Sequence, residues 1–299
     1  MNNQENPLLA GIEAGGTKYV CAVARHPREI LREVRFPTGG PAETLEQAIR
    51  FFREASGEFG PIRAMGVGTF GPADVNPHSP GYGGILTTPK KEWIGFNLVA
   101  ALREGIGEPI PVALDTDVNA AAVGEAELGG GRNCRNICYV TVGTGIGGGF
   151  LLEGHPLHGR MHPEIGHMVV PDFDEPGKAV SACPFHAACL EGRASGPAIE
   201  KRWGRPAVEL PGDHPAWDLE ARYLAAASVD LTAAWSPDVI LIGGGVLQQE
   251  GLIERIRGEF EGLAGRYWTL PPLEDYLRTP ELGQDAGIVG ALSMAYRLL

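Results

Sequence analysis

The sequence lacks the features that send a chain into or across a membrane. No stretch offers about 18 uninterrupted apolar residues, and the N-terminus, MNNQENPLLAGIEAGGTK, has neither a basic region nor an apolar core. Cysteine is scarce and odd in number, at five, which argues against a disulfide framework in a long chain. We therefore expect a cytoplasmic protein with no membrane partner, in which some cysteines are free or bind a metal.

Positive charge is the second shortage. Lys and Arg number 25 against 37 Asp and Glu, which gives a formal net charge of -12. Nucleic acid is a poor partner for such a chain, because phosphate backbones are bound through clustered positive charge. The acidity does not exclude a single bound nucleotide, since backbone N–H groups and a divalent cation attract it locally.

Glycine, by contrast, is abundant, with 43 in 299 residues, roughly twice the ordinary usage. Three glycine clusters stand beside predicted strands, at 11–18, 143–149 and 243–245. Glycine lets successive backbone N–H groups approach a phosphate, although each cluster alone fits a tight turn equally well. No Walker A sequence occurs, and the G-x-G-x-x-G spacing at 143–148 precedes a strand instead of a helix, which disfavours a dinucleotide fold.

Strand and helix patterns alternate along the chain, which predicts an α/β fold of two domains. The predicted strands are 8–14, 18–25, 29–37, 62–68, 111–115, a glycine-turned pair within 137–154, and 237–246. The predicted helices are 41–55, 98–104, 120–128 and 286–298. We expect an N-terminal domain over 1–117, joined by the C-terminal helix 286–299, and a C-terminal domain over 118–285.

Asp117 stands where a predicted strand ends and a helix begins, within DTDVNAAAVGEAEL. A carboxylate at that place points into the cleft of an α/β protein and suits a general base. Asp is equally suited to cap the helix that follows. Both interpretations stand on the residues alone.

A possible metal site follows in the loop 167–191. Three-residue steps join Cys183, His186 and Cys189, and His167 lies upstream, so four N and S ligands are present, as a closed tetrahedral Zn²⁺ site requires. The alternative is two ordinary buried thiols and a surface histidine, but Pro, Gly and acidic residues over 171–181 argue against a core element there. Four ligands leave no open position, which disfavours a zinc-dependent hydrolase.

Other histidines and cysteines have plainer interpretations. His155, His158 and His162 have no accompanying cysteine, and we expect them in a solvated hairpin. Cys21, Cys134 and Cys138 fall in or near predicted strands, and we expect buried free thiols.

The glycine loops give the sequence a specific resemblance. GIEAGGTK is similar to the first phosphate motif of the sugar kinase, actin and Hsp70 superfamily, VTVGTGIGGG to the second, and PDVILIGGGV to its adenosine motif. Within that superfamily the chain resembles the ROK family from Gly11 to about Gly290. The resemblance implies a two-domain, ribonuclease H-like fold with an ATP and sugar cleft between the domains.

The resemblance also implies which residues bind ATP and magnesium. ATP binding falls to Gly15, Gly16, Thr17, Lys18, Gly143, Thr144, Gly145, Gly243, Gly244 and Gly245. Glu13 stands where related glucokinases have Asp, and its carboxylate implies coordination of Mg²⁺ through water.

The sugar and zinc residues are implied in the same way. Asp117 aligns with the catalytic base, and Thr116 replaces the Asn that usually contacts the sugar. The substrate-binding set is Gly71, Thr116, Asp117, Glu164, His167 and Glu191, and the structural zinc set is His167, Cys183, His186 and Cys189. The segment 87–90 with Trp93 also resembles a lining of the sugar pocket.

The implied activity is phosphorylation of a hexose by Mg·ATP, in a homodimer. The Cys–His–Cys form of the zinc loop is typical of fructokinase-like members, which favours D-fructose and the product fructose 6-phosphate. Mannose, glucose and an N-acetylated amino sugar stay open, because a few hydroxyl contacts decide the choice. The family also contains sugar-sensing repressors with a DNA-binding domain ahead of the first loop; ten residues precede Gly11 here, so we expect an enzyme.

Overall fold

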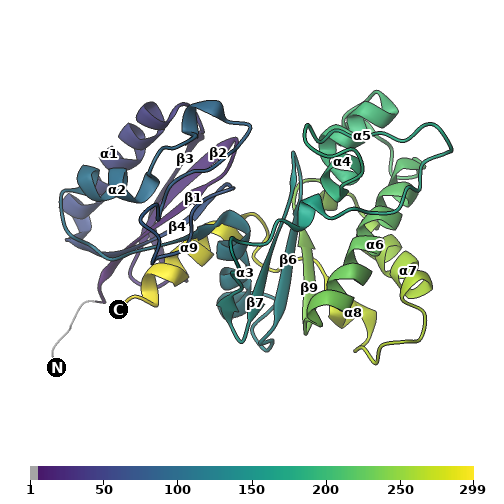
Figure 1. Ribbon diagram of the computed structural model, residues 1–299. Coiled ribbons are helices and arrows are strands. Elements are labelled where there is room, and N and C mark those ends of the chain that lie inside the picture. The colour runs from purple at the N-terminus through teal and green to yellow at the C-terminus, as the bar shows by residue number, and fades with distance from the viewer. Residues whose placement is uncertain (1–5) are drawn as a thin grey trace. The chain divides into compact units, whose positions relative to one another are not determined.

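A computed structural model describes residues 6–299 and divides into two compact units (Figure 1). Unit 1 contains the described residues up to Arg132, together with Pro156–His162 and Gln284–Leu299, and unit 2 contains Asn133–His155 and Pro163–Gly283. The sequence-based boundary after residue 117 left helix α3 (Asp117–Leu128) with the second domain. In the structure α3 belongs to unit 1, because it packs against α9 (Ala286–Tyr296) and β4 (Ile62–Thr69).

The sheet of unit 1 has the strand order β3-β2-β1-β4-β5. Its strands are β1 (Leu8–Ala14), β2 (Lys18–Ala24), β3 (Ile30–Pro37), β4 and β5 (Val112–Thr116). The first three form the predicted antiparallel meander, and β4 lies parallel to both β1 and β5. Helix α1 (Pro41–Phe59) and helix α2 (Leu98–Ile106) belong to the same unit as α3 and α9. Helix α1 extends beyond its predicted end at residue 55 and ends at Gly60, which has a φ of 96°.

Helix α9 lies against β1, β4 and α3 at very close range. A Cβ on Gly66 would overlap the carbonyl oxygen of Ala291, and one on Gly290 would overlap that of Ala120. Glycine is required at both positions because the backbones themselves are in contact. This packing fixes the carboxyl ends of β1 and β5, where Glu13 and Asp117 stand.

The sheet of unit 2 has the order β10-β9-β6-β7-β8. Its strands are β6 (Ile137–Val142), β7 (Ile146–Leu152), β8 (His155–Pro156), β9 (Val239–Gly243) and β10 (Leu277–Arg278). Strands β6 and β7 form an antiparallel hairpin, and β9 is parallel to β6 and to β10. Read from its other end, this order repeats that of unit 1. The two sheets with their covering helices confirm the α/β class.

The helices of unit 2 had no counterpart among the predicted elements. They are α4 (Leu190–Ala194), α5 (Gly196–Trp203), α6 (Ala216–Trp235), α7 (Leu252–Ala264) and α8 (Leu273–Tyr276). The 3₁₀ turns of the chain are Lys91–Trp93, Ile165–His167, Ala207–Glu209, Val246–Gln248 and Gly283–Asp285. Helix α6 is buried over most of its surface, so its sequence lacks the narrow apolar stripe from which an amphipathic helix is predicted. Within residues 6–299, none of the helices combines the length and apolarity that a membrane crossing requires.

Candidate active site

The first glycine loop is the turn between β1 and β2 in unit 1. The Gly15 N–H donates to the Lys18 carbonyl at 2.9 Å and closes the turn. Thr38 holds the loop from outside: its hydroxyl donates to the Gly15 carbonyl at 2.8 Å, and its N–H to the Thr17 carbonyl at 3.0 Å. The loop is therefore a fixed backbone structure, with Thr17 exposed at its tip.

Glu13 precedes this loop on β1. Its Oε1 lies 3.7 Å from the Lys18 ammonium, and its Oε2 is buried without a hydrogen-bond partner among the described residues. A Cβ on Gly287 would lie 2.8 Å from the carboxyl carbon, so the first turn of α9 packs directly on this group. Burial raises the pKa of Glu13, while Lys18 and Arg35 oppose that shift. An orphaned buried carboxylate oxygen is suited to a cation or a cation-bound water.

The start of helix α3 separates the two interpretations of Asp117. The N-cap is Thr116, whose hydroxyl accepts the Asn119 N–H at 3.2 Å. Asp117 is the first helical residue, and its Oδ1 accepts the Val118 N–H at 2.9 Å. Capping is thus performed by the neighbouring residue Thr116, so the N-cap role does not account for Asp117.

Asp115 is the buried anchor of the same turn. Its Oδ1 accepts the Thr116 N–H at 2.8 Å and a side-chain N–H of Asn119 at 2.7 Å. Only 4% of Asp115 is exposed, so these bonds replace water that the carboxylate has lost. The structural role expected for Asp115 and the helix-start role of Asn119 fit these contacts.

Two of the three histidines expected in a solvated hairpin are elsewhere, and that prediction was wrong for them. The His158 Nε2 lies 2.9 Å from the Asp115 Oδ2, and the hydrogen bond to Asp115 raises the pKa of His158. His162 is buried, and its Nε2 accepts the Ala73 N–H at 3.2 Å. His155 is exposed, as expected. The partners are distant in sequence, so spacing gave no signal of them.

Trp93 belongs to the core of unit 1. Its side chain is buried in the core of unit 1, with its ring edge-on to Phe70 and Phe96. The indole N–H donates to the Gly39 carbonyl at 3.0 Å. Trp93 is therefore a buried core residue with its polar atom satisfied. Gly71, which follows Phe70, is partly exposed.

The second glycine loop, Gly143–Gly145, is the turn of the β6–β7 hairpin in unit 2. The Gly143 N–H donates to the Gly145 carbonyl at 2.9 Å, and the Gly196 N–H at the start of α5 donates to the Gly143 carbonyl at 2.8 Å. The Ile146 N–H donates to the Glu191 Oε2 at 3.1 Å. This loop is therefore held by α4 and α5.

The third glycine loop follows β9 and lies beside the second. Gly244 has a φ of 94°, and a Cβ there would overlap the carbonyl oxygen of Val142, the residue before Gly143. Only glycine fits this backbone and this contact. The structure thus brings together the sequence-predicted loops 143–145 and 243–245 within unit 2.

Glu164 and Glu191 form the acidic part of unit 2. Burial, with the charge of Glu191 as a second cause, raises the pKa of Glu164 to about 7. A Cβ on Gly166 would overlap the Ile146 carbonyl oxygen, so the turn that carries Glu164 and His167 is pressed against β7. Glu164 and His167 thus stand at one 3₁₀ turn, and Glu191 stands on the short helix α4.

The predicted metal ligands converge. The potential ligand atoms of His167, Cys183, His186 and Cys189 all lie within 4.8 Å of one another. The Cys183 Sγ lies 3.9 Å from the His167 Nδ1 and 3.7 Å from the His186 Nδ1. A tetrahedral zinc with ordinary bond lengths separates its S and N ligands by about 3.6 Å. Burial raises the pKa of the Cys189 thiol to about 11, a cost that a bound cation would offset.

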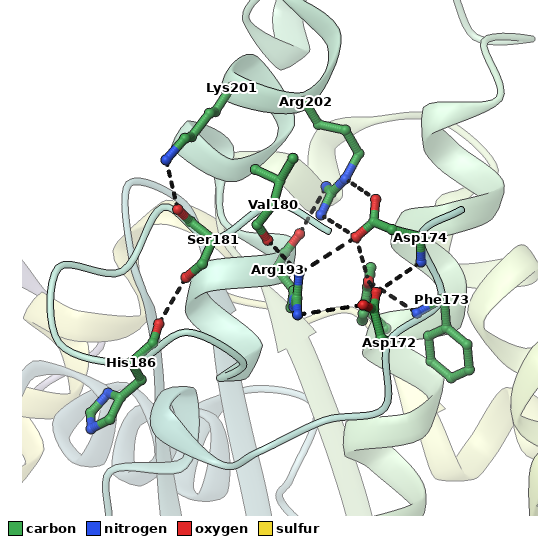
Figure 2. A network of polar contacts seen from close by, with 10 residues as sticks. Asp172, Phe173, Asp174, Val180, Ser181, His186, Arg193, Lys201 and Arg202 are labelled. Atoms are coloured by element: carbon green, nitrogen blue, oxygen red, sulfur yellow. Dashed lines mark hydrogen bonds and ion pairs between the residues drawn. The ribbon is translucent and has the colours of Figure 1, made fainter. Parts of the chain in front are cut away.

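A network of charged groups anchors the loop that leads to this cluster (Figure 2). Arg202 of α5 donates to Asp174 through Nε at 2.6 Å and through Nη2 at 3.2 Å, and Tyr223 donates to the same carboxylate at 2.8 Å. Arg193 of α4 lies 3.7 Å from Asp174 and 3.8 Å from Asp172. These groups tie an irregular segment to the two helices beside it.

The same network reaches the metal cluster itself. The Arg193 Nη1 donates to the Val180 carbonyl at 2.8 Å, Lys201 to the Ser181 carbonyl at 2.9 Å, and the Ser181 hydroxyl to the His186 carbonyl at 2.8 Å (Figure 2). Cys189 is also the N-cap of helix α4, and its sulfur accepts the Gly192 N–H at 3.4 Å. The helix that carries Glu191 is therefore held at both ends.

The remaining cysteines are free thiols. Burial raises the pKa of Cys21 and of Cys138, which stand on β2 and β6. Cys134 is partly exposed in the segment before β6, so its predicted burial is incomplete.

Comparison with known proteins gives a consistent result over the full chain. The model of the ROK family matches residues 9–297. A fructokinase from Pediococcus pentosaceus is 41% identical over 98% of this chain and 99% of its own. A crystal structure of a ROK hexokinase from Thermus thermophilus has a TM-score of 0.78 at 30% identity, covering 97% of this chain and 98% of that one.

A second solved structure extends this result. A ROK family glucokinase from Streptomyces griseus, in complex with glucose and AMPPNP, has a TM-score of 0.76 at 26% identity, with 97% of this chain and 99% of that one covered. These matches confirm the two-domain fold of the sugar kinase, actin and Hsp70 superfamily. The chain belongs to the ROK family.

Proposed function

We propose that the protein is an ATP-dependent hexose kinase that converts D-fructose to fructose 6-phosphate. The observation that carries this proposal is the 41% identity to a fructokinase over nearly the entire length of both chains. The match covers 98% of this chain and 99% of the relative, so it supports a similarity of the whole enzyme and not of one segment. The hexokinase and glucokinase structures support the reaction class. Mannose, glucose and an N-acetylated amino sugar stay as alternative substrates.

The three glycine loops supply the nucleotide site in this proposal. Gly15–Lys18 and Gly143–Gly145 bind the phosphates through backbone N–H groups, and Gly243–Gly245 lies beside the adenosine. AMPPNP in the glucokinase structure is an ATP analogue, which supports this use. Glu13 would hold Mg²⁺ through a water molecule, a role that its orphaned Oε2 supports. Bound Mg²⁺ neutralises charge on the phosphates during transfer.

Asp117 is the general base of the proposed reaction. A sugar hydroxyl attacks the γ-phosphorus, its proton passes to the Asp117 carboxylate, and the bond from the γ-phosphorus to its bridging oxygen breaks to leave ADP. Capping of α3 by Thr116 supports this role, because Asp117 is then not needed to satisfy the helix. Thr116 and Gly71 contribute contacts to the sugar from the same unit.

Glu164, His167 and Glu191 bind sugar hydroxyls in unit 2. A Glu164 carboxyl with a pKa of about 7 can both donate and accept a hydrogen bond near neutral pH. His167 contributes one ring nitrogen to the sugar and the other to the metal, which fixes its tautomer. His167, Cys183, His186 and Cys189 would hold a zinc ion, which would have a structural role because four protein ligands leave no position for a substrate or water.

A panel of hexoses tests the proposal. ADP release with Mg·ATP should be fastest with fructose, and slower with mannose, glucose, N-acetylglucosamine and N-acetylmannosamine. The measured quantity is kcat/KM for each sugar. A higher kcat/KM for another hexose would contradict fructose as the preferred substrate but support a hexose kinase. The absence of turnover with every sugar would reject the kinase activity itself.

A further inference from the structure

His158 and Asp115 form a pair close in the fold to Asp117, the proposed base, and the proposed reaction assigns no role to this pair. His158 comes from the segment Pro156–His162, which belongs to unit 1 although both of its sequence neighbours belong to unit 2. Its Nε2 lies 2.9 Å from Oδ2 and 3.2 Å from Oδ1 of Asp115. The side chain of Asp115 is only 6% exposed, whereas that of His158 is 32% exposed. A group from a distant segment thus closes over a buried carboxylate.

The bonds of Asp115 bracket Asp117 in the sequence. Its Oδ1 accepts hydrogen bonds from the backbone N–H of Thr116, which precedes Asp117, and from the side-chain amide of Asn119, which stands two residues after Asp117. The carboxylate therefore determines the path of the backbone that carries the base. With Oδ2 held by His158, the carboxylate plane cannot rotate away from these two donors.

The segment that carries His158 is itself fixed on unit 1. Four residues later, His162 accepts the Ala73 N–H at 3.2 Å and is only 4% exposed. This hydrogen bond gives the segment a second anchor on unit 1. Two anchors on one short segment limit the freedom of His158 to leave Asp115.

We propose that His158 is a positioning residue: through Asp115 it fixes the turn from which Asp117 projects and compensates the charge beside the base. This inference rests on the proposed function, since it gives Asp117 the role of base. Misplacement of a reacting group by about 1 Å costs about a hundredfold in rate. The charge also matters, because an uncompensated Asp115 carboxylate makes ionisation of Asp117 harder. Tyr82 is a further titratable group near Asp115: burial is the main cause of its raised pKa, and the charge of Asp115 raises this pKa as well.

The test compares His158→Leu, His158→Gln and the control His155→Leu, whose exposed histidine neighbours the same segment. We expect His158→Leu to lower kcat by about tenfold to a hundredfold, with KM for ATP unchanged. The acid limb of the pH profile of kcat/KM should move to higher pH in this variant. Glutamine can still donate an N–H, so His158→Gln should recover most of kcat and retain the shifted limb.

The outcomes separate the inference from the function on which it rests. The positioning role would be overturned by one combination of results. In it, the wild type and His155→Leu turn over hexose, and His158→Leu has the kcat and the acid limb of the wild type. Absence of turnover in the wild type would reject the kinase proposal. The pair is also tested without activity, by NMR titration of His158 in the wild type and in Asp115→Asn: a lower pKa in the variant is expected, and an unchanged pKa would contradict the pairing.

Discussion

Thr116 caps helix α3 by accepting the N–H of Asn119 at 3.2 Å, and it thereby relieves its neighbour Asp117 of that task. The sequence had left capping and catalysis equally open for Asp117. A helix needs one N-cap residue, so the geometry assigns the structural role to the threonine. The two residues should therefore respond differently to substitution.

The first prediction contrasts Asp117→Asn with Thr116→Ala. Loss of a positioned base should lower kcat of Asp117→Asn by about 10² to 10⁴, with melting temperature and ATP affinity retained. Loss of the cap should lower the free energy of unfolding of Thr116→Ala by about 1 kcal/mol. Steady-state kinetics and thermal unfolding measure the two effects. A kcat near the wild-type value in Asp117→Asn would remove Asp117 from the mechanism.

The turns and strands of the site were accessible to sequence reasoning because their signals are local. Gly15, Gly143 and Gly244 each follow an apolar run. A glycine directly after such a run indicates a tight turn at the end of a strand. The pairs His158 with Asp115 and His162 with Ala73 were not accessible. Each joins positions distant in sequence, and a histidine in a polar stretch is typical of a surface loop until its partner is known.

The second prediction concerns pH and Glu164. Its pKa is raised from 4.5 to about 7, so the protonated carboxyl stabilises the fold below about pH 4.5, and this contribution is lost as the pH rises through about 7. Glu164→Gln does not titrate. Relative to the wild type it should gain about 1–2 kcal/mol of unfolding free energy between pH 4.5 and 8, after allowance for solvent screening.

Chemical unfolding at a series of pH values measures this difference. The matched control is Glu261→Gln, at an exposed position of α7, for which the difference from the wild type should not change with pH. A pH-independent difference for Glu164→Gln would show that Glu164 ionises normally.

The third prediction distinguishes two adjacent glycines. Gly244→Ala places a Cβ against the Val142 carbonyl at a φ of 94°, and should cost roughly 1–3 kcal/mol of unfolding free energy. Gly245 has a φ of -64° and nothing within 4 Å of an added Cβ, so Gly245→Ala should change stability by less than about 0.5 kcal/mol. Equal melting temperatures of the two variants would contradict the close approach of β9 to β6.

The fourth prediction is metal content. Purified protein should contain about one zinc per chain, and the double variant Cys183→Ser, Cys189→Ser should contain none. Cys134→Ser is the control, since Cys134 is a thiol outside the cluster, and it should keep its zinc. Elemental analysis of freshly purified protein measures the zinc content. Absence of zinc would contradict the metal site and show that these cysteines and histidines bind no zinc.

The metal cluster and its support illustrate the limit of spacing arguments. Cys183, His186 and Cys189 were recognisable because three-residue steps are typical of zinc ligands. The ion pairs of Arg193 and Arg202 with Asp174 were not, since charged residues in an irregular stretch are usually solvated. Only the fold shows that the segment 172–181 is tied to α4, which carries Glu191, and to α5.

The most direct test of the central claim is the identity of the product. The protein, incubated with Mg·ATP and fructose, should yield ADP and fructose 6-phosphate in equal amounts, followed by phosphorus NMR and compared with the authentic ester. Asp117→Asn should form almost none in the same time. Release of ADP with inorganic phosphate and no sugar ester, or an unchanged ATP signal with every hexose, would contradict the account.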